Sequence, residues 1–376
     1  MHIVLIMANN SSTPYFNRFA DLAVNDKSIQ LSFICLFPTK PQMIDDMSKR
    51  GLKCFWIKFS NTKRKINYLQ AIIKGNQLLR QIKPDIIHTH LFDDSVPMLI
   101  AAKLAGIKHR VISKLDAGFH YYYNRKWVWL DKLNNALATN IVCVSSENKG
   151  FVINKEKANK KKIHLIHQGI SEEEVTKFSK EDIDYINKEF NLLNNEKIIL
   201  SVSRFIEWKG QKFILEAANK ILMENTECKF ILLGAGDFRL TLQKWVEKKN
   251  LSRKIIIHEP INRSRLNALY SLSNIFVHAA LLEPFGFVIA EAMLNKIPII
   301  TTNTGAAKDA LEHKKSAFIS KKKDNQSIYE GIKYMLNNNT KNLTDKAYQN
   351  AKELFSIEKM WERHLNLYKT IVNTKG

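Results

Sequence analysis

Several features that the sequence lacks limit what the protein does. No apolar run reaches the roughly 18 residues that a membrane-spanning helix needs. The first apolar segment, residues 2–7, is too short and has no basic lead for a signal peptide, so we expect a first core strand there. The four cysteines, which are Cys35, Cys54, Cys143 and Cys228, form no C-x-x-C pair. We therefore expect reduced, buried thiols in a cytoplasmic protein.

The glycine pattern of a dinucleotide-binding site is also missing. After the first expected strand stands the loop Asn9–Ser12, without a glycine. A later turn, Gly234-Ala235-Gly236, has Arg239 where the dinucleotide fingerprint places its third glycine. Both departures argue against a dehydrogenase.

Length and charge suggest two domains and an anionic partner. A chain of 376 residues exceeds what one core usually supports. The net charge is +22, and residues 1–170 carry 26 basic against 11 acidic residues, +15, which leaves +7 for the remainder. This bias is typical of proteins that meet nucleic acid, a phospholipid surface or an anionic glycolipid. A compositional preference for lysine and asparagine explains part of it equally well.

Short apolar runs alternate with helical patterns along the whole chain, as in βαβ units with parallel sheets. The expected strands are 2–7, 30–37, 53–59, 85–90, 110–114, 140–145 and 163–167, followed by 197–203, 229–233, 254–258, 274–279 and 298–302. The alternation stops in residues 171–195, where charged residues dominate. The α/β pattern thus predicts an N-terminal Rossmann-like domain, 1–170, a linker region, 171–195, and a second Rossmann-like domain, 196–355. Facing edges of the two domains would form a cleft.

Two glutamates, Glu283 and Glu291, bracket a loop that leads into a helix. Pro284 cannot continue a strand, and Gly286 allows backbone to approach a ligand closely. Most glutamate pairs are solvated surface residues. Glu291, however, is flanked by Ile289, Ala290, Ala292 and Met293, and a carboxylate among apolar neighbours needs hydroxyl or amide partners.

This segment resembles the Glu-x7-Glu motif of family 4 retaining glycosyltransferases, which have the GT-B fold. The resemblance covers most of the second domain and the first only loosely. It implies that Glu283 contacts the donor sugar and that Glu291 holds the ribose hydroxyls. It further implies that the Gly234–Gly236 turn and the amides of Phe285, Gly286 and Phe287 line the donor site. The amphipathic segment 356–376 would return to the first domain, as the last helix of GT-B enzymes does.

A basic pair follows the first strand of the second domain. Arg204 and Lys209 precede an expected helix start, a suitable arrangement for a diphosphate because a guanidinium binds two oxygens and an ammonium adds charge. As a pattern alone, such a pair is more often surface decoration. Its position after a strand matches the diphosphate motif of the family, in which the basic pair replaces a metal.

In the first domain, His120 follows a strand and a glycine. An idle surface histidine is the commoner case, but the family presents a histidine over the donor sugar, and the resemblance implies this role for His120. Asp116, Tyr121 and Arg125 are candidates for the acceptor side. Aromatic residues beside basic ones suit a sugar or lipid headgroup, and equally a partly buried helix. His88 and His90 form a His-x-His pair for which we expect no metal, since no further ligand completes the set.

These observations predict a retaining glycosyltransferase that transfers a sugar from a nucleotide-diphosphate sugar, with a UDP-sugar favoured, to a glycan or lipid-linked acceptor in surface polysaccharide or glycolipid synthesis. No cofactor and no metal are expected. Alternatives are a GT-B nucleotide-sugar epimerase and a non-enzymatic basic protein that binds nucleic acid. We do not expect nucleic acid as a partner. The basic, amphipathic segment 58–83 predicts reversible docking on an anionic membrane surface.

Overall fold

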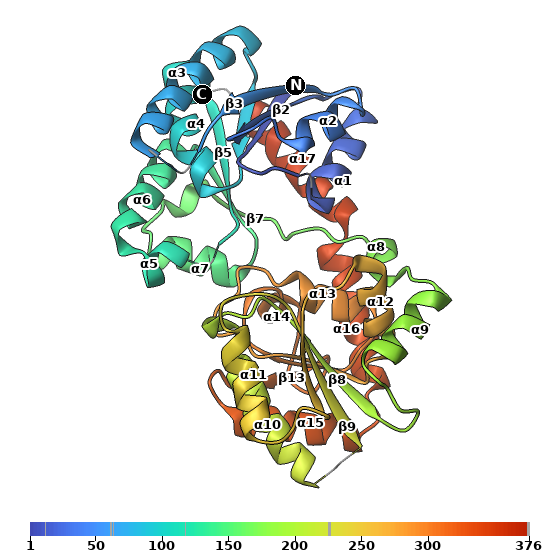
Figure 1. Cartoon of the computed structure of the whole chain (residues 1–376). Helices are drawn as coiled ribbons and strands as arrows, with labels where there is room; N and C mark the ends of the chain where they lie inside the picture. Colours follow the sequence, from blue (N-terminus) through green and yellow to red (C-terminus); the bar gives the residue numbers. More distant parts are fainter. Residues whose placement is uncertain (12, 61, 63, 117, 225–226, 374–376) are drawn as a thin grey trace. The chain divides into compact units, whose positions relative to one another are not determined.

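The computed structural model describes the whole chain except residues 12, 61, 63, 117, 225–226 and 374–376. Internal contacts divide it into two units (Figure 1). The first unit comprises Met1–Gly169 and Ile357–Gly376, and the second comprises Ile170–Ser356. The C-terminal segment therefore packs with the N-terminal one, as the resemblance implied.

A parallel seven-stranded sheet forms the centre of the first unit, in the order β3-β2-β1-β4-β5-β6-β7. The strands are β1 (His2–Met7), β2 (Gln30–Phe37), β3 (Lys53–Lys58), β4 (Ile86–Thr89), β5 (His109–Lys114), β6 (Asn140–Cys143) and β7 (Ile163–Leu165). All seven were predicted. The apolar runs of the inner strands, such as β1 and β4, are buried on both faces, which is why they show no simple polar alternation, whereas the edge strand β3 is mostly exposed or half-buried.

Helices cover both faces of this sheet (Figure 1). Alternate residues of β1 point to opposite cores: Ile3, Leu5 and Met7 contribute to one, Val4 and Ile6 to the other. The first core includes residues of α1 (Pro14–Val24), α2 (Gln42–Ser48) and α17 (Ile357–Asn373). The second includes residues of α3 (Arg64–Ile82), α4 (Phe92–Leu104), α6 (Val128–Leu137) and α7 (Ser146–Asn154), with the short α5 (Phe119–Tyr123), η1 (Arg125–Trp127) and η2 (Lys160–Lys162) in the connections.

The second unit has a parallel six-stranded sheet in the order β10-β9-β8-β11-β12-β13. Its strands are β8 (Lys197–Val202), β9 (Cys228–Leu233), β10 (Ile255–His258), β11 (Ile275–His278), β12 (Ile299–Thr302) and β13 (Phe318–Ser320), of which β13 was not predicted. Its helices are α10 (Gln211–Glu224), α11 (Arg239–Lys248), α12 (Arg263–Leu272), α13 (Phe287–Leu294), α14 (Gly305–Ala310), α15 (Asn325–Asn337) and α16 (Lys341–Phe355), with η3 (Glu207–Lys209) after β8. None of the described helices in either unit combines the length and apolar character needed to cross a bilayer.

The structure places residues 171–195, which the sequence suggested as a linker region, inside the second unit. They contain α8 (Glu172–Thr176) and α9 (Lys180–Glu189). Asn267 of α12 donates hydrogen bonds to the carbonyl oxygens of Glu174 and Lys177. Both helices are short and strongly charged, so few apolar residues mark their buried sides.

Strand order reverses once in each sheet. The reversal lies between β1 and β4 in the first unit and between β8 and β11 in the second. Ligands of open α/β sheets bind beyond the carboxyl ends of the strands at such a switch point. The loops after β8 and β11 are those that carry Arg204, Lys209 and Glu283.

Candidate active site

A buried ion pair lies at the switch point of the second unit. Lys209, at the end of η3, donates from Nζ to Oε2 of Glu283 in the loop after β11. His278, the last residue of β11, has its Nε2 2.9 Å from the same oxygen. Lys209 is 8% exposed, Glu283 5% and His278 1%. Two motifs that the sequence places 74 residues apart thus meet in one cluster.

The cluster keeps its carboxylate ionised. Burial raises the pKa of Glu283, but the hydrogen bond from His278 and the charge of Lys209 outweigh it and lower the pKa to about 2. An ammonium has three donors, of which Glu283 takes one. Lys209 can therefore still donate to a phosphate oxygen, while Glu283 fixes its position.

Arg204 differs from Lys209 because it is exposed, and its guanidinium has no partner among the described residues. Its backbone is nevertheless held firmly. The N–H of Phe205 donates to the carbonyl oxygen of Ala235 over 2.7 Å, which joins the loop after β8 to the loop after β9. A Cβ on Gly234 would overlap the carbonyl oxygen of Ser203, and one on Gly236 would overlap that of Phe205. The glycine turn thus allows a close backbone contact that positions Arg204.

Glu291 lies on α13 and is held by two side chains of α12. Tyr270 donates its hydroxyl proton to Oε2 over 2.9 Å, and Arg263 donates to Oε1 over 2.8 Å. Burial and the neighbouring carboxylate raise the pKa of Tyr270 well above its usual range. A carboxylate has about four acceptor positions, so Glu291 can accept two further hydrogen bonds.

Gly286 shapes the connection between the two glutamates. It has a φ of 88°, in the left-handed region that favours glycine, and it precedes the first residue of α13. A Cβ at this position would lie 2.9 Å from Cγ of Glu283. Phe285 is buried against Phe287, with ring centroids 5.1 Å apart, whereas Phe287 is partly exposed at the helix start.

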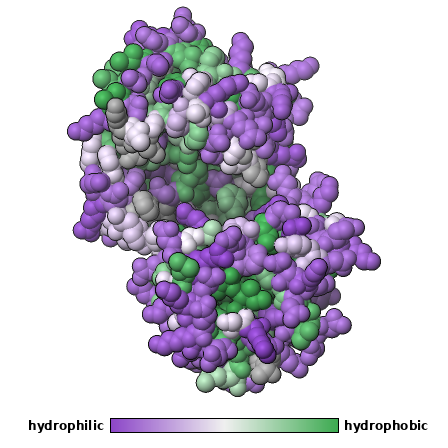
Figure 2. Space-filling model, viewed as in Figure 1, coloured by the Kyte–Doolittle hydropathy of each residue, from purple (hydrophilic) through white to green (hydrophobic). Residues whose placement is uncertain are grey.

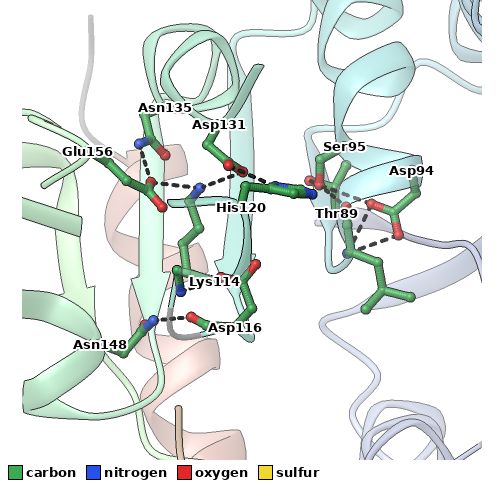
Figure 3. Close-up of polar contacts among 12 residues, drawn as sticks. Thr89, Asp94, Ser95, Lys114, Asp116, His120, Asp131, Asn135, Asn148 and Glu156 are labelled. Atoms are coloured by element: carbon green, nitrogen blue, oxygen red, sulfur yellow. Dashed lines mark hydrogen bonds and ion pairs between the residues drawn. The ribbon is translucent and has the colours of Figure 1, made fainter. Parts of the chain in front are cut away.

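His120 belongs to a buried polar network of the first unit (Figure 3). Its Nδ1 lies 2.9 Å from Oδ2 of Asp131 on α6. Lys114, at the end of β5, lies with Nζ 3.8 Å from Oδ1 of Asp131 and 2.9 Å from Glu156. The ring of Phe92 packs edge-on against the imidazole, with centroids 4.2 Å apart. The histidine that the resemblance selected is thus held by residues from several elements.

The acceptor-side candidates have structural partners of their own. The carboxylate of Asp116 accepts the N–H of Gly118 over 2.7 Å, which closes the turn before α5. The ring of Tyr121 lies 5.7 Å from the guanidinium carbon of Arg125 and 5.6 Å from Nζ of Lys155. Ala117, in the same loop, lies outside the described residues, as does Ser12 in the loop after β1.

His88 and His90 lie buried at the switch point of the first unit. Nδ1 of His88 is 2.6 Å from the hydroxyl of Tyr368, and its Nε2 is 2.8 Å from Oγ of Ser113. The ring of His90 lies 4.2 Å from that of His88. Both ring nitrogens of His88 are therefore engaged by hydroxyl groups, and the absence of a metal stays a prediction.

Sequence reasoning missed several residues of both sites. His278 was visible as a polar residue at the end of an apolar strand, five positions before Glu283. Asp131 and Glu156 had no local signal, because their role depends on the contacts with Lys114. Arg263 and Tyr270 are spaced seven positions apart on α12, which places them on one side of that helix.

Two family models match the chain. Residues 182–354 match glycosyl transferases group 1, and residues 26–174 match glycosyltransferase family 4. The chain belongs to the family 4-like glycosyltransferases. The match assigns transfer of a sugar as the activity class, in place of the non-enzymatic and epimerase alternatives.

Curated relatives agree with this assignment. The glycosyltransferase is 23% identical to the capsular polysaccharide biosynthesis glycosyltransferase CapM of Staphylococcus aureus, over 81% of each chain. It is also 23% identical to the UDP-Gal:alpha-D-GlcNAc-diphosphoundecaprenol alpha-1,3-galactosyltransferase of Escherichia coli, over 82% of this chain and 81% of that one. An uncharacterized glycosyltransferase of Methanocaldococcus jannaschii is 24% identical over 66% of this chain and 64% of its own.

Solved structures establish the GT-B fold of this glycosyltransferase. Anabaena HepE in complex with UDP and glucose superposes with a TM-score of 0.81, at 17% identity, over 98% of this chain and all of that one. A glycosyltransferase from Rickettsia africae superposes with a TM-score of 0.79, at 20% identity, over 100% of this chain and 99% of that one. Two Rossmann-like units with parallel sheets are common to the fold.

Proposed function

We propose that this glycosyltransferase transfers a sugar from a UDP-sugar to a glycan or lipid-linked acceptor of bacterial-type surface polysaccharide or glycolipid, with retention of anomeric configuration. The observation that carries the proposal is the buried Lys209–Glu283 pair at the switch point of the second unit, together with the exposed Arg204 in the loop after β8. The choice of UDP rests on HepE, which was solved with UDP, and on the galactosyltransferase relative, whose name gives UDP-Gal as donor.

In the proposed reaction, the second unit binds the donor. Arg204 and Lys209 bind the diphosphate and stabilise the negative charge that develops on it as the bond between the anomeric carbon and the phosphate oxygen breaks. The N–H groups at the start of α13 add partial positive charge. The acceptor hydroxyl forms the new bond on the face that the diphosphate leaves, and its proton passes to the departing phosphate oxygen. The products are UDP and the glycosylated acceptor.

The two glutamates have separate tasks in this proposal. Glu283 accepts hydrogen bonds from hydroxyls of the transferred sugar, in addition to those from Lys209 and His278. Glu291 accepts the ribose hydroxyls at its remaining acceptor positions. His120 of the first unit accepts a hydrogen bond from the sugar while positive charge grows at the anomeric carbon.

A transfer assay tests this function. Purified protein is incubated with UDP-glucose, UDP-galactose or UDP-N-acetylglucosamine and a polyprenyl-diphosphate sugar acceptor, and the product is analysed by NMR. We expect an α-linked product from these α-linked donors. A β-linked product would contradict retention. Transfer from a GDP-sugar only would contradict the choice of base.

We further propose that the first unit docks on the anionic inner face of a membrane. Ile66, Leu69 and Ile73 form a stripe on α3 in which each residue is more than half exposed, beside the exposed Lys65 and Lys74. The other side of α3 packs on α4, so the stripe is not needed for the core. Apolar residues are exposed at the α3 end of this unit in the view of Figure 2. Apolar groups beside lysines suit a headgroup interface.

Liposome co-sedimentation tests this docking. The variant K65E/K74E should lose binding to vesicles with anionic lipid, and higher salt should weaken the wild type. The variant K321E/K323E, which changes exposed lysines of the second unit, is the control for net charge. Binding that ignores lipid charge, or equal loss in both variants, would contradict docking through α3.

A further inference from the structure

We propose that Asp131 is a positioning residue that holds the imidazole of His120 with its proton on Nδ1, and that Lys114 and Glu156 maintain Asp131 in this role. This inference rests on the proposed function, because it takes His120 to act on the transferred sugar. It adds three residues to the reaction, Lys114, Asp131 and Glu156. Together with His120 they form what we call the Lys114 network: Lys114, His120, Asp131 and Glu156 (Figure 3).

The contact between Asp131 and His120 determines which ring nitrogen carries the proton. Nδ1 lies 2.9 Å from Oδ2, and an ionised carboxylate only accepts hydrogen bonds. The proton must therefore be on Nδ1, and Nε2 keeps its lone pair. A neutral imidazole in this tautomer can accept a hydrogen bond from a sugar hydroxyl. Carboxylates orient histidines in this way at many reactive sites.

Lys114 balances two buried carboxylates. It is 5% exposed, Asp131 is 7% and Glu156 6%. Burial lowers the pKa of Lys114, but the charges of Glu156, Asp131 and Asp116 outweigh it and raise the pKa above its usual value. Without the cation, two carboxylates would share one buried site, and like charges there favour uptake of a proton. A protonated Asp131 could no longer hold Nδ1–H in the same way.

The network has a second anchor that fixes Glu156. Nδ2 of Asn135 donates to Oε2 of Glu156 over 2.6 Å. Asp131 and Asn135 lie four residues apart on α6, so one helix presents both. A pocket beside the network is lined by Lys114, Asp131 and Asn134, and two further titratable groups, His90 and Asp116, line it as well. Its volume is about 110 Å³, which is below the range of small-ligand pockets, about 300 to 1,000 Å³.

Nitrogen NMR of the full-length protein tests the tautomer without any activity. The signals of His120 are assigned by comparison with H120N. We expect a neutral ring at pH 7.5 with the proton on Nδ1. A proton on Nε2, or a doubly protonated ring, would overturn the proposal. In D131N the Nδ1–H signature should be lost, and unchanged signals would overturn it equally.

Kinetics test the role in the reaction. Loss of a carboxylate that orients a functional histidine typically costs about 10- to 100-fold. We expect this loss in kcat for D131N, with donor KM within about twofold, and partial rescue in D131E. K114M should move the acid limb of kcat/KM to higher pH, and K114M/E156Q, which removes one charge of each sign, should move it back. A K114M profile that keeps the wild-type limb would overturn the role of Lys114.

A matched control separates positioning from stability. Lys229 and Glu196 form a comparably buried ion pair in the second unit, 2.9 Å apart, remote from the proposed machinery. K229M should lower the melting temperature and leave the pH profile of kcat/KM unchanged. If K229M and K114M shift the profile equally, the Lys114 network is only structural. If the wild-type protein shows no sugar transfer but the NMR signature is present, the proposed function fails and the positioning of His120 stands.

Discussion

The two units share one architecture but fill their switch points with opposite chemistry. In the second unit, the strand ends carry a charged pair, Lys209 and Glu283, with His278 hydrogen-bonded to the carboxylate and Arg204 exposed in the loop after β8. In the first, they carry neutral groups that are completely buried. These groups are His88, His90, His364 and Tyr368, and the last two come from α17. The same topology thus supports a charged site in one unit and a hydrogen-bonded core in the other.

The difference shows what a switch point requires when it is not used for phosphate. Burial is the main cause that lowers the pKa of His88 well below its usual value, that of His90 to about 3 and that of His364 to about 4. Neutral rings can then pack closely and exchange hydrogen bonds with tyrosine and serine hydroxyls. The chain closes its first unit with its last helix through these contacts.

The largest expected effect is a difference in acid stability. The three buried histidines are neutral when folded and become charged when unfolded, so the stability of the first unit falls as pH drops below about 6.5. The slope is about 1.4 kcal/mol per pH unit for each histidine, until the folded pKa values are reached. The pKa of Glu283 is also lowered, but from a lower starting value. Its contribution to the stability of the second unit is therefore complete above about pH 4.5 and is lost only as pH falls toward 2.

Hydrogen exchange measured at pH 7 and pH 5, corrected for intrinsic rates, checks this prediction. Protection should decrease in β4 and α17 and persist in β11 and α13. Equal loss of protection in both units, or loss at a higher pH in the second unit, would contradict this difference in acid stability.

Arg204 and Lys209 should both be needed for turnover but should differ in their effect on stability. Removal of either is expected to lower kcat/KM by about 10²- to 10³-fold, the usual scale for a lost donor to developing charge. K209A should also destabilise the protein by about 3 to 5 kcal/mol, because Glu283 keeps a buried charge without its cation. R204A should melt at the wild-type temperature.

Steady-state kinetics and calorimetry on both variants decide the matter. Near-wild-type turnover of both variants with saturating donor would show that Arg204 and Lys209 take no part in the reaction. Equal melting temperatures would show that Glu283 does not depend on Lys209.

Substitution of the two glutamates should change different kinetic constants. E283A removes a contact to the transferred sugar and should lower kcat by about tenfold or more. E291A removes a ribose contact that is equal in ground and transition states, so donor KM should rise with a modest loss of kcat. Free UDP that binds E291A as tightly as wild type, in a calorimetric titration, would show that the ribose assignment is wrong.

The smallest expected effects come from the removal of one buried tyrosine hydroxyl in each unit. Y368F removes the hydroxyl 2.6 Å from His88 and should cost about 1 to 2 kcal/mol of stability with kinetics unchanged. Y270F removes a donor to Glu291 and should raise donor KM. Melting temperatures and KM values of both variants are the measurement. A raised donor KM in Y368F would mean that the histidine core of the first unit takes part in catalysis.

The sequence predicted the fold well because apolar runs of parallel strands are continuous and easily recognised. It failed where the signal was weak: β13 has three residues, and α8 and α9 each bury a single residue, Val175 and Ile186. At the candidate site, Arg204, Lys209, Glu283 and Glu291 were predicted from local motifs. Their partner His278, five positions before Glu283, was visible in the sequence but was missed. Arg263 and the Lys114 network could not be found in this way, because they depend on contacts between different helices, strands and loops, which no local spacing encodes.

Hydrogen exchange of the full-length protein with and without saturating UDP tests the central claim most directly, because it follows both switch points in one experiment. The account predicts that UDP increases protection in residues 203–210 and 283–291 of the second unit and leaves residues 86–90 and α17 unchanged. Protection centred on residues 86–90, with none in the loops after β8 and β11, would contradict it.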